Sequence, residues 1–232
     1  MSVLRIVATP IGNLEDITLR AIRVLKESNF ILCEDTRVTR KLLDHYQITT
    51  PTISFHQHSG ELKIEKVMSL LKQGNDLALV TDAGTPGISD PGGKLVQLVR
   101  DEISEQVLIE SIPGPSALAA AISITGAGFD RFLFLGFLPH KKGRSTKIKE
   151  IFSTQYPVVL YESKHRILKL ISELQLESLN HKFDLQISLA RELSKLHESF
   201  YLGNPERILS ILQENPNNIK GEFVVLIRKE EK

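Results

Sequence analysis

The chain has 232 residues, 41% of them hydrophobic and 25% charged, and 29 Lys and Arg against 28 Asp and Glu give a formal net charge of +1. This composition is typical of a globular protein and excludes collagen, low-complexity disorder and disulfide-rich scaffolds. The single cysteine, Cys33, excludes an internal disulfide and a multi-cysteine zinc site. There is no signal-peptide cleavage pattern and no apolar run long enough to span a membrane, so we expect a cytoplasmic protein.

The first half of the chain alternates predicted strands and helices. Strands are expected over 3–9, 30–35, 52–55, 76–81 and 106–112, and helices over 14–25, 38–46, 61–73 and 94–102. The first helix is expected to start near Asn13, with Glu15 and Asp16 in its first turn. This alternation predicts a mainly parallel sheet with helices on both faces, whose ligands bind beyond the carboxyl ends of the strands.

A proline- and glycine-rich segment, residues 113–116, interrupts the pattern and predicts a boundary between domains 1–114 and 115–232. Beyond it, strands are expected over 132–139, 157–163, 185–192, 198–203 and 221–228, and helices over 116–125, 164–174 and 205–214. Several of these strands follow one another directly, which predicts a mixed sheet. The fold class is therefore α/β, with two α/β domains.

The connection after the strand 76–81 is dense in glycine, proline and aspartate. Residues 82–93 read DAGTPGISDPGG, about twice the ~2–6 residues of a plain strand-to-helix loop. Glycines let the backbone approach a ligand closely, and Asp82 and Asp90 offer acceptors to a cationic or amino-bearing ligand. A ligand-binding loop explains this composition better than a plain connection does.

Three other segments leave a structural and a functional interpretation open. Residues 8–18, ATPIGNLEDIT, form a capped turn or present backbone N–H groups to a ligand. Residues 111–121 form a linker with a packed small-residue helix, or a polar pocket at Ser116. Residues 33–43, CEDTRVTRKLL, form a solvated charge cluster or a substrate site where Asp35 and Arg37 position a polar group.

Positive charge is concentrated in the second half. Residues 1–116 hold 12 Lys and Arg against 15 Asp and Glu, net −3, whereas residues 117–232 hold 17 against 13, net +4. The segment HKKGRSTKIK, residues 140–149, begins a helix with cations, which is unfavourable for the helix dipole. An anionic partner would explain this placement, so the small net charge does not exclude RNA.

Common cofactor fingerprints are absent. The sequence has no P-loop and no complete GxGxxG motif, and neither GxSxG nor HExxH occurs. His56 and His58 alternate on a strand end but lack a third partner, so no metal site is expected.

The sequence contains a series of motifs in this order: ATPIGNLEDIT, CEDTRVTRKLL, LVTDAGTPGISDPGG, IPGPSA, FLGFLPHKKGR, YESKHR, ARELSKLHE and KGEFV. From residue 3 to about 228, the chain closely resembles the small-subunit ribosomal RNA methyltransferases of the tetrapyrrole methylase (class III methyltransferase) superfamily. The resemblance implies two α/β domains with a cleft between them and a homodimer. It also implies methyl transfer from S-adenosylmethionine to the ribose 2′-oxygen of a cytidine in the decoding region of 16S rRNA.

The resemblance also implies site residues. The methyl donor would contact Pro10, Asp82, Gly84, Pro86, Gly87, Ile88, Ser89, Ser116, Ala117, Tyr161, Glu162, Leu193, Gly221 and Glu222. Candidates for proton removal from the ribose hydroxyl are Asp35, Glu192 and His165, with Arg37, Arg166, Arg191 or Lys195 for positioning. Expected RNA contacts are Arg40, Lys141, Lys142, Arg144, Lys147, His165 and Arg166.

The chain departs from this family at two points. Relatives often have a doubled arginine where this chain has Arg144-Ser145, and many carry a further helical segment beyond the position of Lys232. Both departures leave the strength of RNA binding open. One alternative is a tetrapyrrole or corrin-precursor methylase, although a small substrate needs no extended cationic rim. The other is a non-catalytic rRNA-binding assembly factor, against which the loop 82–93 argues.

Overall fold

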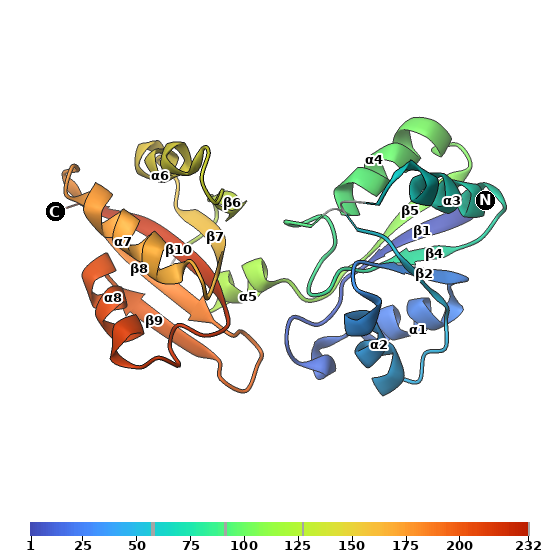
Figure 1. The fold of residues 1–232 in the computed structure, drawn as a ribbon, viewed down its shortest axis with the longest axis horizontal. Helices are drawn as coiled ribbons and strands as arrows, with labels where there is room; N and C mark the ends of the chain where they lie inside the picture. Colours follow the sequence, from blue (N-terminus) through green and yellow to red (C-terminus); the bar gives the residue numbers. More distant parts are fainter. Residues whose placement is uncertain (57–58, 91, 127, 232) are drawn as a thin grey trace. The chain divides into compact units, whose positions relative to one another are not determined.

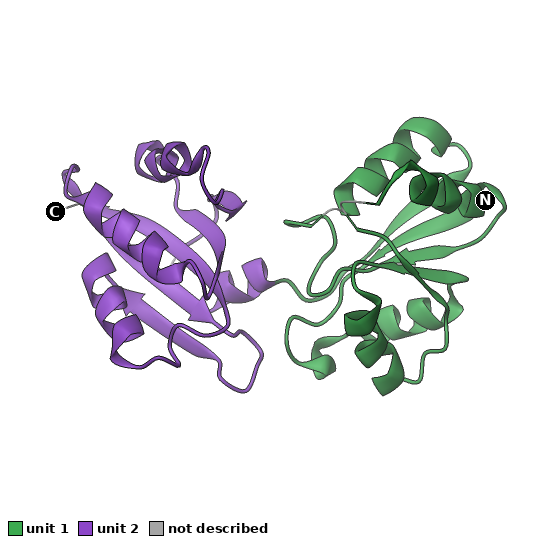
Figure 2. Ribbon diagram, in the orientation of Figure 1, with its two compact units in different colours: residues 1–116 green, residues 117–232 purple. Residues whose placement is uncertain are grey.

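A computed structural model describes residues 1–56, 59–90, 92–126 and 128–231 (Figure 1). Contacts divide the chain into two compact units, residues 1–116 and residues 117–232 (Figure 2). No helix in the described part of the chain is long and apolar enough to cross a membrane. His58, one of the two histidines considered above as a metal ligand, lies outside the described residues.

Unit 1 contains a five-stranded sheet in the order β3-β2-β4-β1-β5, and every neighbouring pair is parallel. Its strands are β1 (Ser2–Val7), β2 (Phe30–Cys33), β3 (Thr52–Ser54), β4 (Leu77–Leu79) and β5 (Val107–Ile112). Its α-helices are α1 (Leu19–Glu27), α2 (Thr36–His45), α3 (Glu61–Lys72) and α4 (Gly92–Ile103). The predicted parallel sheet is confirmed.

Helices cover both faces of this sheet, because successive side chains of a strand point to opposite faces. Ile31 and Cys33 of β2 belong to a buried cluster with residues of α1 and α2. Leu32, between them, belongs to a second cluster with residues of α3 and α4 (Figure 1). The near-continuous apolar strands predicted from the sequence therefore serve two cores.

The predicted helix over 14–25 is two helices. A 3₁₀ helix, η1 (Leu14–Asp16), is capped by Asn13, whose side chain accepts a hydrogen bond from the Glu15 N–H at 3.1 Å. The chain then becomes extended at Ile17, and Thr18 caps α1 by accepting from the Ala21 N–H at 3.0 Å. The prediction of one continuous helix from Asn13 was wrong because Thr18 supplies a second N-cap within the apolar pattern.

Unit 2 contains a mixed five-stranded sheet in the order β6-β7-β10-β8-β9, in which only β6 and β7 are parallel. Its strands are β6 (Leu133–Phe137), β7 (Val158–Ser163), β8 (Phe183–Arg191), β9 (Ser199–Gly203) and β10 (Glu222–Glu231). Its helices are α5 (Ala117–Ser123), α6 (Arg144–Ser153), α7 (Ile167–Ser178) and α8 (Pro205–Glu214). One large apolar cluster joins the sheet to α6, α7 and α8. The predicted mixed sheet is confirmed.

Candidate functional site

The carboxyl ends of the parallel strands in unit 1 bring three of the predicted motifs together. Thr9, just after β1, and Gly84, in the loop after β4, exchange backbone hydrogen bonds at 2.9 and 3.0 Å. Thr85 donates its hydroxyl to the Pro115 carbonyl at 3.0 Å. Segments 8–18, 82–93 and 111–116 therefore meet at the edge where ligands of parallel sheets bind.

The loop 82–93 has an unusual backbone. Gly84 and Gly87 have φ of +84° and +89°, which suits glycine, and Ser89 has φ of +60° despite its side chain. A Cβ at Gly84 would lie 3.4 Å from Ile11 and 3.7 Å from the Pro115 carbonyl. Backbone strain of this kind is concentrated at functional sites.

Not every acceptor in this loop is free for a ligand. The Asp90 carboxylate accepts hydrogen bonds from the N–H groups of Gly87 at 2.5 Å and Gly92 at 2.6 Å. Asp90 thus closes the loop and begins α4, so its expected role as an acceptor for a cationic ligand is not supported. The other residues expected to contact the donor here differ in exposure. Pro86 is buried, Ile88 half-buried and Ser89 exposed, and Ser116 and Ala117, at the start of α5, are half-buried.

Asp35 and Arg37, predicted to be catalytic, hold each other at the start of α2. Asp35 accepts from the Arg37 N–H at 2.8 Å, which makes it the N-cap, and its carboxylate pairs with the guanidinium at 2.7 Å. These hydrogen bonds lower the pKa of Asp35 to about 2. A carboxylate with so low a pKa is a poor proton acceptor near neutral pH, so the contacts favour a structural role.

The pKa values of two neighbouring carboxylates, Glu34 and Asp82, are raised instead. Burial, followed by the charges of Asp82 and Asp90, raises the pKa of Glu34, whose carboxylate accepts from the Thr81 hydroxyl at 3.3 Å. Burial and the charge of Asp35 also raise the pKa of Asp82, although its carboxylate accepts from the Asp35 N–H at 3.2 Å. The ends of β2 and β4 therefore carry carboxylates whose negative charge would be stabilised by a cationic ligand.

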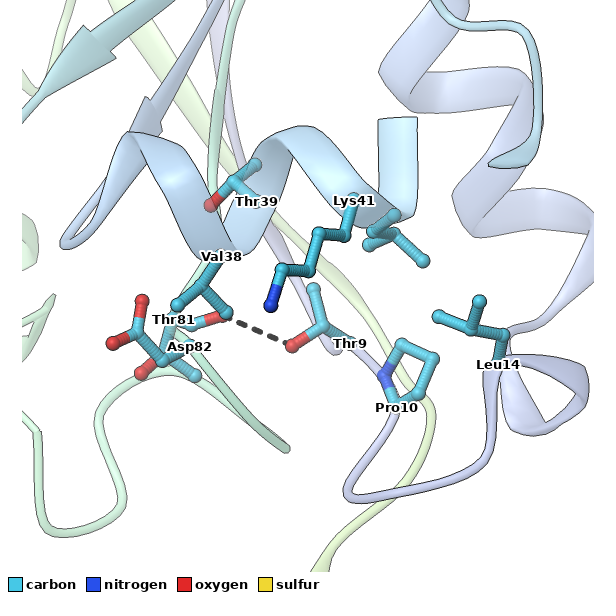
Figure 3. Close-up of a pocket in the computed structure, with 9 residues that line it drawn as sticks. Thr9, Pro10, Leu14, Val38, Thr39, Lys41, Thr81 and Asp82 are labelled. Atoms are coloured by element: carbon cyan, nitrogen blue, oxygen red, sulfur yellow. Dashed lines mark hydrogen bonds between the residues drawn. The ribbon is translucent and has the colours of Figure 1, made fainter. Parts of the chain in front are cut away.

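A pocket of about 160 Å³ opens beside these strand ends (Figure 3). Its lining residues come from the loop after β1, from α2 and from the end of β4: Thr9, Pro10, Leu14, Val38, Thr39, Lys41, Leu42, Thr81 and Asp82. The Thr9 hydroxyl donates to the Thr81 carbonyl at 3.0 Å and so joins two of these segments. Pro10 and Asp82, both expected to contact the donor, line the same pocket.

In unit 2, the other predicted catalytic residue, Glu192, lies in a compact ionic cluster. Its carboxylate accepts from the Glu222 N–H and from the Lys195 ammonium, both at 2.9 Å, and Lys195 also reaches the Glu222 carboxylate at 2.8 Å. Burial raises the pKa of Glu192, but these hydrogen bonds outweigh it and lower the pKa. The hydrogen bonds of Glu192 therefore suit a residue that positions the two turns better than one that removes a proton.

Gly221, expected to contact the donor, is required by this cluster. Its φ is +97°, and a Cβ there would lie 2.4 Å from the Glu192 carboxyl group. Glu192 itself has φ of +51° and Ser194 has φ of +61°, with buried Leu193 between them. The turn after β8 and the turn before β10 are thus fitted to each other through Glu192.

The side chain of Arg191 also joins the turn after β8 to the turn before β10. Its buried guanidinium donates to the carbonyl oxygens of Lys220 at 2.7 Å, Asn217 at 2.8 Å and His197 at 2.9 Å. It also reaches the Ser199 hydroxyl at 3.3 Å. Arg191 is therefore occupied by backbone carbonyls and is a structural clamp.

Two arginines expected to contact RNA are instead paired with carboxylates of their own unit. Arg144 is 5% exposed and pairs with Glu173 at 2.7 Å, and its guanidinium lies 3.8 Å from the Glu162 carboxylate. Arg166 pairs with Glu162 at 2.8 Å and donates to the Leu138 carbonyl at 2.8 Å. The guanidinium of Arg144 is therefore not free to face RNA. The Glu162 side chain is a buried ion-pair partner, and its predicted contact with the donor stays a prediction.

Other predicted residues of this unit are more accessible. Tyr161 is half-buried and packs edge-on against Phe134 and Phe137, with ring centroids 5.1 and 5.6 Å apart. The side chains of Lys141, Lys142, Lys149 and His165 are exposed. Lys147 is half-buried and pairs with Glu150 at 2.7 Å.

Arg40, on α2 in unit 1, is 65% exposed and pairs with Asp44 at 2.9 Å. Thr39 and Lys41 line the pocket but carried no sequence-based prediction, and Glu34 was considered only as one charge of the motif 33–43. All three lie in the motif 33–43, where the functional interpretation was based on Asp35 and Arg37 alone. In the described residues, no group of three or more His, Cys, Asp or Glu side chains could hold a metal ion.

Comparison with solved structures shows the same fold. A cobalt precorrin-4 methyltransferase of cobalamin biosynthesis matches with a TM-score of 0.70 and 16% identity, over 97% of this chain and 94% of that one. A uroporphyrin-III-C-methyltransferase from Thermus thermophilus matches with a TM-score of 0.62 and 17% identity, over 97% and 94%.

Comparison of sequences is more specific. The family model of the tetrapyrrole (corrin/porphyrin) methylases matches residues 3–208. Ribosomal RNA small subunit methyltransferase I of Hydrogenobaculum sp. is 44% identical over 98% of this chain and 96% of the relative. The protein of that name from Thermotoga maritima is 38% identical over the full length of both chains, and that from Synechocystis sp. is 41% identical over 98% and 79%. The chain therefore belongs to the tetrapyrrole methylase family, in its ribosomal RNA small subunit methyltransferase I branch.

Proposed function

We propose that this chain transfers a methyl group from S-adenosylmethionine to the ribose 2′-oxygen of a cytidine in 16S rRNA. The observation that carries the proposal is the full-length similarity to three curated ribosomal RNA small subunit methyltransferases I, at 38–44% identity. The choice of a cytidine 2′-oxygen in the decoding region as the target rests on the family resemblance carried by the motifs.

The residues of unit 1 fit the proposed donor. S-adenosylmethionine carries its electrophilic methyl group on a positively charged sulfonium that has no hydrogen-bond donor of its own. Carboxylate and carbonyl oxygens suit this group because their negative charge stabilises the cation. Asp82 has a carboxylate whose charge is disfavoured by burial and by Asp35, and a neighbouring cation would relieve that cost. Gly87 is exposed, and a Cβ added there would have nothing within 4 Å, so the loop backbone can approach a ligand closely at this position.

In methyl transfer, the nucleophile, the methyl group and the leaving sulfur must be in line, so positioning contributes most of the catalysis. The residues of this chain suit that task. Asp35 fixes the start of α2, and Glu192 and Lys195 fix the turns of unit 2. The Asp82 carboxylate would stabilise the positive charge of the sulfonium. Positioning by Asp35, Arg37 and Glu192 agrees with their pairing better than proton removal does.

We further propose that the exposed cations Lys141, Lys142 and Lys149 contact phosphates of the 30S subunit, with His165 and Arg40 as further contacts. Their exposure and the net charge of +4 on residues 117–232 support this. A homodimer and a cytoplasmic location are proposed from the family resemblance.

The deciding experiment incubates the purified chain with labelled S-adenosylmethionine and 30S particles and maps the label. Label on a cytidine ribose of 16S rRNA is expected. Transfer to a tetrapyrrole precursor but not to 30S particles would favour the corrin-type alternative. Binding to 30S particles without any binding of the donor in calorimetry would favour an assembly factor.

A further inference from the structure

The pocket of unit 1 is a candidate binding site for part of the substrate (Figure 3). We propose that it receives the pyrimidine base of the target nucleotide, with Lys41 as the residue that recognises the base. The inference rests on the proposed function and identifies the part of the RNA that the site reads.

The size of the pocket limits what can enter. Its volume is about 160 Å³, well below the ~300–1,000 Å³ of pockets that enclose drug-sized ligands. A methyl donor that consists of a nucleoside joined to an amino acid is too large to be enclosed by this space, although it can contact Pro10 and Asp82 at its lining. A single six-membered ring fits, and enzymes that modify nucleotides place the unstacked nucleotide in a small fitted pocket.

The walls of the pocket suit a flat ring. Pro10, in the loop after β1, and Leu14, the first residue of η1, lie opposite Val38 of α2 (Figure 3). Leu42 of α2 also lines the pocket. Apolar walls with a few polar groups are typical of sites that hold an aromatic ligand. Apolar walls on two sides suit a flat ring better than a phosphate, for which Lys41 is the one charged donor in the lining.

Lys41 supplies the polar contact. Its side chain runs along the pocket, and its ammonium points into the space between Thr9 and Val38 (Figure 3). No ion pair links Lys41 to a carboxylate elsewhere in the described chain, whereas its neighbour Arg40 pairs with Asp44. An ammonium donates only, so it recognises acceptors, and a cytosine presents two adjacent ones, O2 and N3.

Asp82 lies on the lining of the same pocket and supplies an acceptor. Carboxylates accept from the amino group of cytosine, whereas uracil presents a carbonyl at that position. The combination of one ammonium and one carboxylate therefore favours cytosine over uracil. Thr39, whose buried hydroxyl adjoins the Cys33 thiol and has no geometrically good hydrogen bond, completes the α2 side of the pocket.

The test uses the full chain and separates the base from the donor. Lys41→Met removes the ammonium, and Val38→Phe fills the pocket; Val38 is 39% exposed, so a larger side chain does not disturb the core. Lys26→Met, at an exposed lysine on α1, is the matched control. We expect methyl transfer to 30S particles to fall about 10- to 100-fold in both pocket variants, the range for losing a charged hydrogen bond. The control should keep its activity, and the donor Kd from calorimetry should stay within about twofold of the wild-type value.

Unchanged transfer in both pocket variants, or a loss of donor affinity parallel to the loss of transfer, would overturn the assignment. If the wild-type chain fails to methylate 30S particles, the proposed function fails, and a second measurement still decides the inference. Cytidine titrated into a chain with labelled Leu and Val methyl groups should shift the signals of Leu14, Val38 and Leu42. No shift of these signals, or an equal shift with adenosine, would reject a pyrimidine pocket.

Discussion

Replacing Gly221 with alanine should destabilise unit 2 more than its backbone conformation alone requires. The added Cβ would lie 2.4 Å from Cγ, Cδ and Oε1 of Glu192, closer than side-chain carbons approach. Glu192 cannot retreat without cost, because its carboxylate accepts from the Glu222 N–H and the Lys195 ammonium, both at 2.9 Å. The substitution must therefore break hydrogen bonds as well as strain the backbone.

The magnitude follows from these two contributions. A left-handed conformation costs a non-glycine residue about 1–2 kcal/mol. Each hydrogen bond to a charged group contributes about 1.5–3 kcal/mol, and a partly exposed carboxylate such as Glu192 belongs at the lower end. Gly221→Ala should thus lower the free energy of unfolding by about 3–5 kcal/mol.

Gly126→Ala is the control, because Gly126 lies in the same unit, has φ of +66°, and a Cβ added there would have nothing within 4 Å. It should cost only the backbone contribution of about 1–2 kcal/mol. Urea unfolding followed by tyrosine fluorescence measures both variants, since Tyr156, Tyr161 and Tyr201, three of the four tyrosines, lie in unit 2.

A double-mutant cycle with Glu192→Ala isolates the contact. Without the Glu192 side chain, the added methyl group meets open space, so Gly221→Ala should then cost no more than Gly126→Ala. Equal costs for the two glycine substitutions in the wild-type background would refute the reasoning. An undiminished cost of Gly221→Ala in the Glu192→Ala background would refute it as well.

Three further outcomes are expected. Asp82→Ala should weaken donor binding at least tenfold in calorimetry, because it removes an acceptor for the sulfonium; unchanged affinity would reject that placement. Replacing Lys141 and Lys142 with alanine should leave the donor Kd unchanged and reduce rRNA methylation most at low salt, with the difference from wild type shrinking as salt rises, since fewer phosphate contacts give a shallower salt dependence. The carboxyl group of Asp35 should titrate near pH 2 by NMR. Since that pKa is below its ordinary value of 3.8, the stability contributed by Asp35 is full above pH 3.8 and is lost as the pH falls through about 2. The stability difference between wild type and Asp35→Asn should shrink over that interval, and a constant difference would show that Asp35 is not held as described.

Hydrophobic periodicity was enough to predict both sheets, because buried strands and amphipathic helices leave distinct patterns. The meeting of Thr9, Gly84 and Pro115 also followed, since parallel strands end at one edge. Local capping was harder to predict: within an apolar pattern that looks unbroken, Ile17 ends the 3₁₀ helix and Thr18 caps the next helix.

Ion pairing between distant segments was the part that sequence patterns could not supply. Arg144 stands in a run of surface-like cations, and its partner Glu173 is 29 residues away on α7. Nothing in the local spacing distinguishes it from Lys141 or Lys142. Its burial depends on the packing of α6 against α7, which is a tertiary property. The same holds for Arg191, whose partners are backbone carbonyls of two separate turns.

The division between paired and unpaired charges changes which residues are candidates for chemistry. Asp35, Asp90, Glu162 and Glu192 are all engaged by N–H groups or cations, so they shape loops and helix starts. Glu34, whose pKa is raised by burial as that of Asp82 is, is better matched to proton transfer near neutral pH than Asp35 is. A methyl group on a sulfonium is already activated for transfer. Catalysis at a site of this kind therefore depends mainly on aligning the nucleophile, the methyl group and the leaving sulfur. Such a site requires rigid loops more than strong bases, and the paired side chains of both units provide that rigidity.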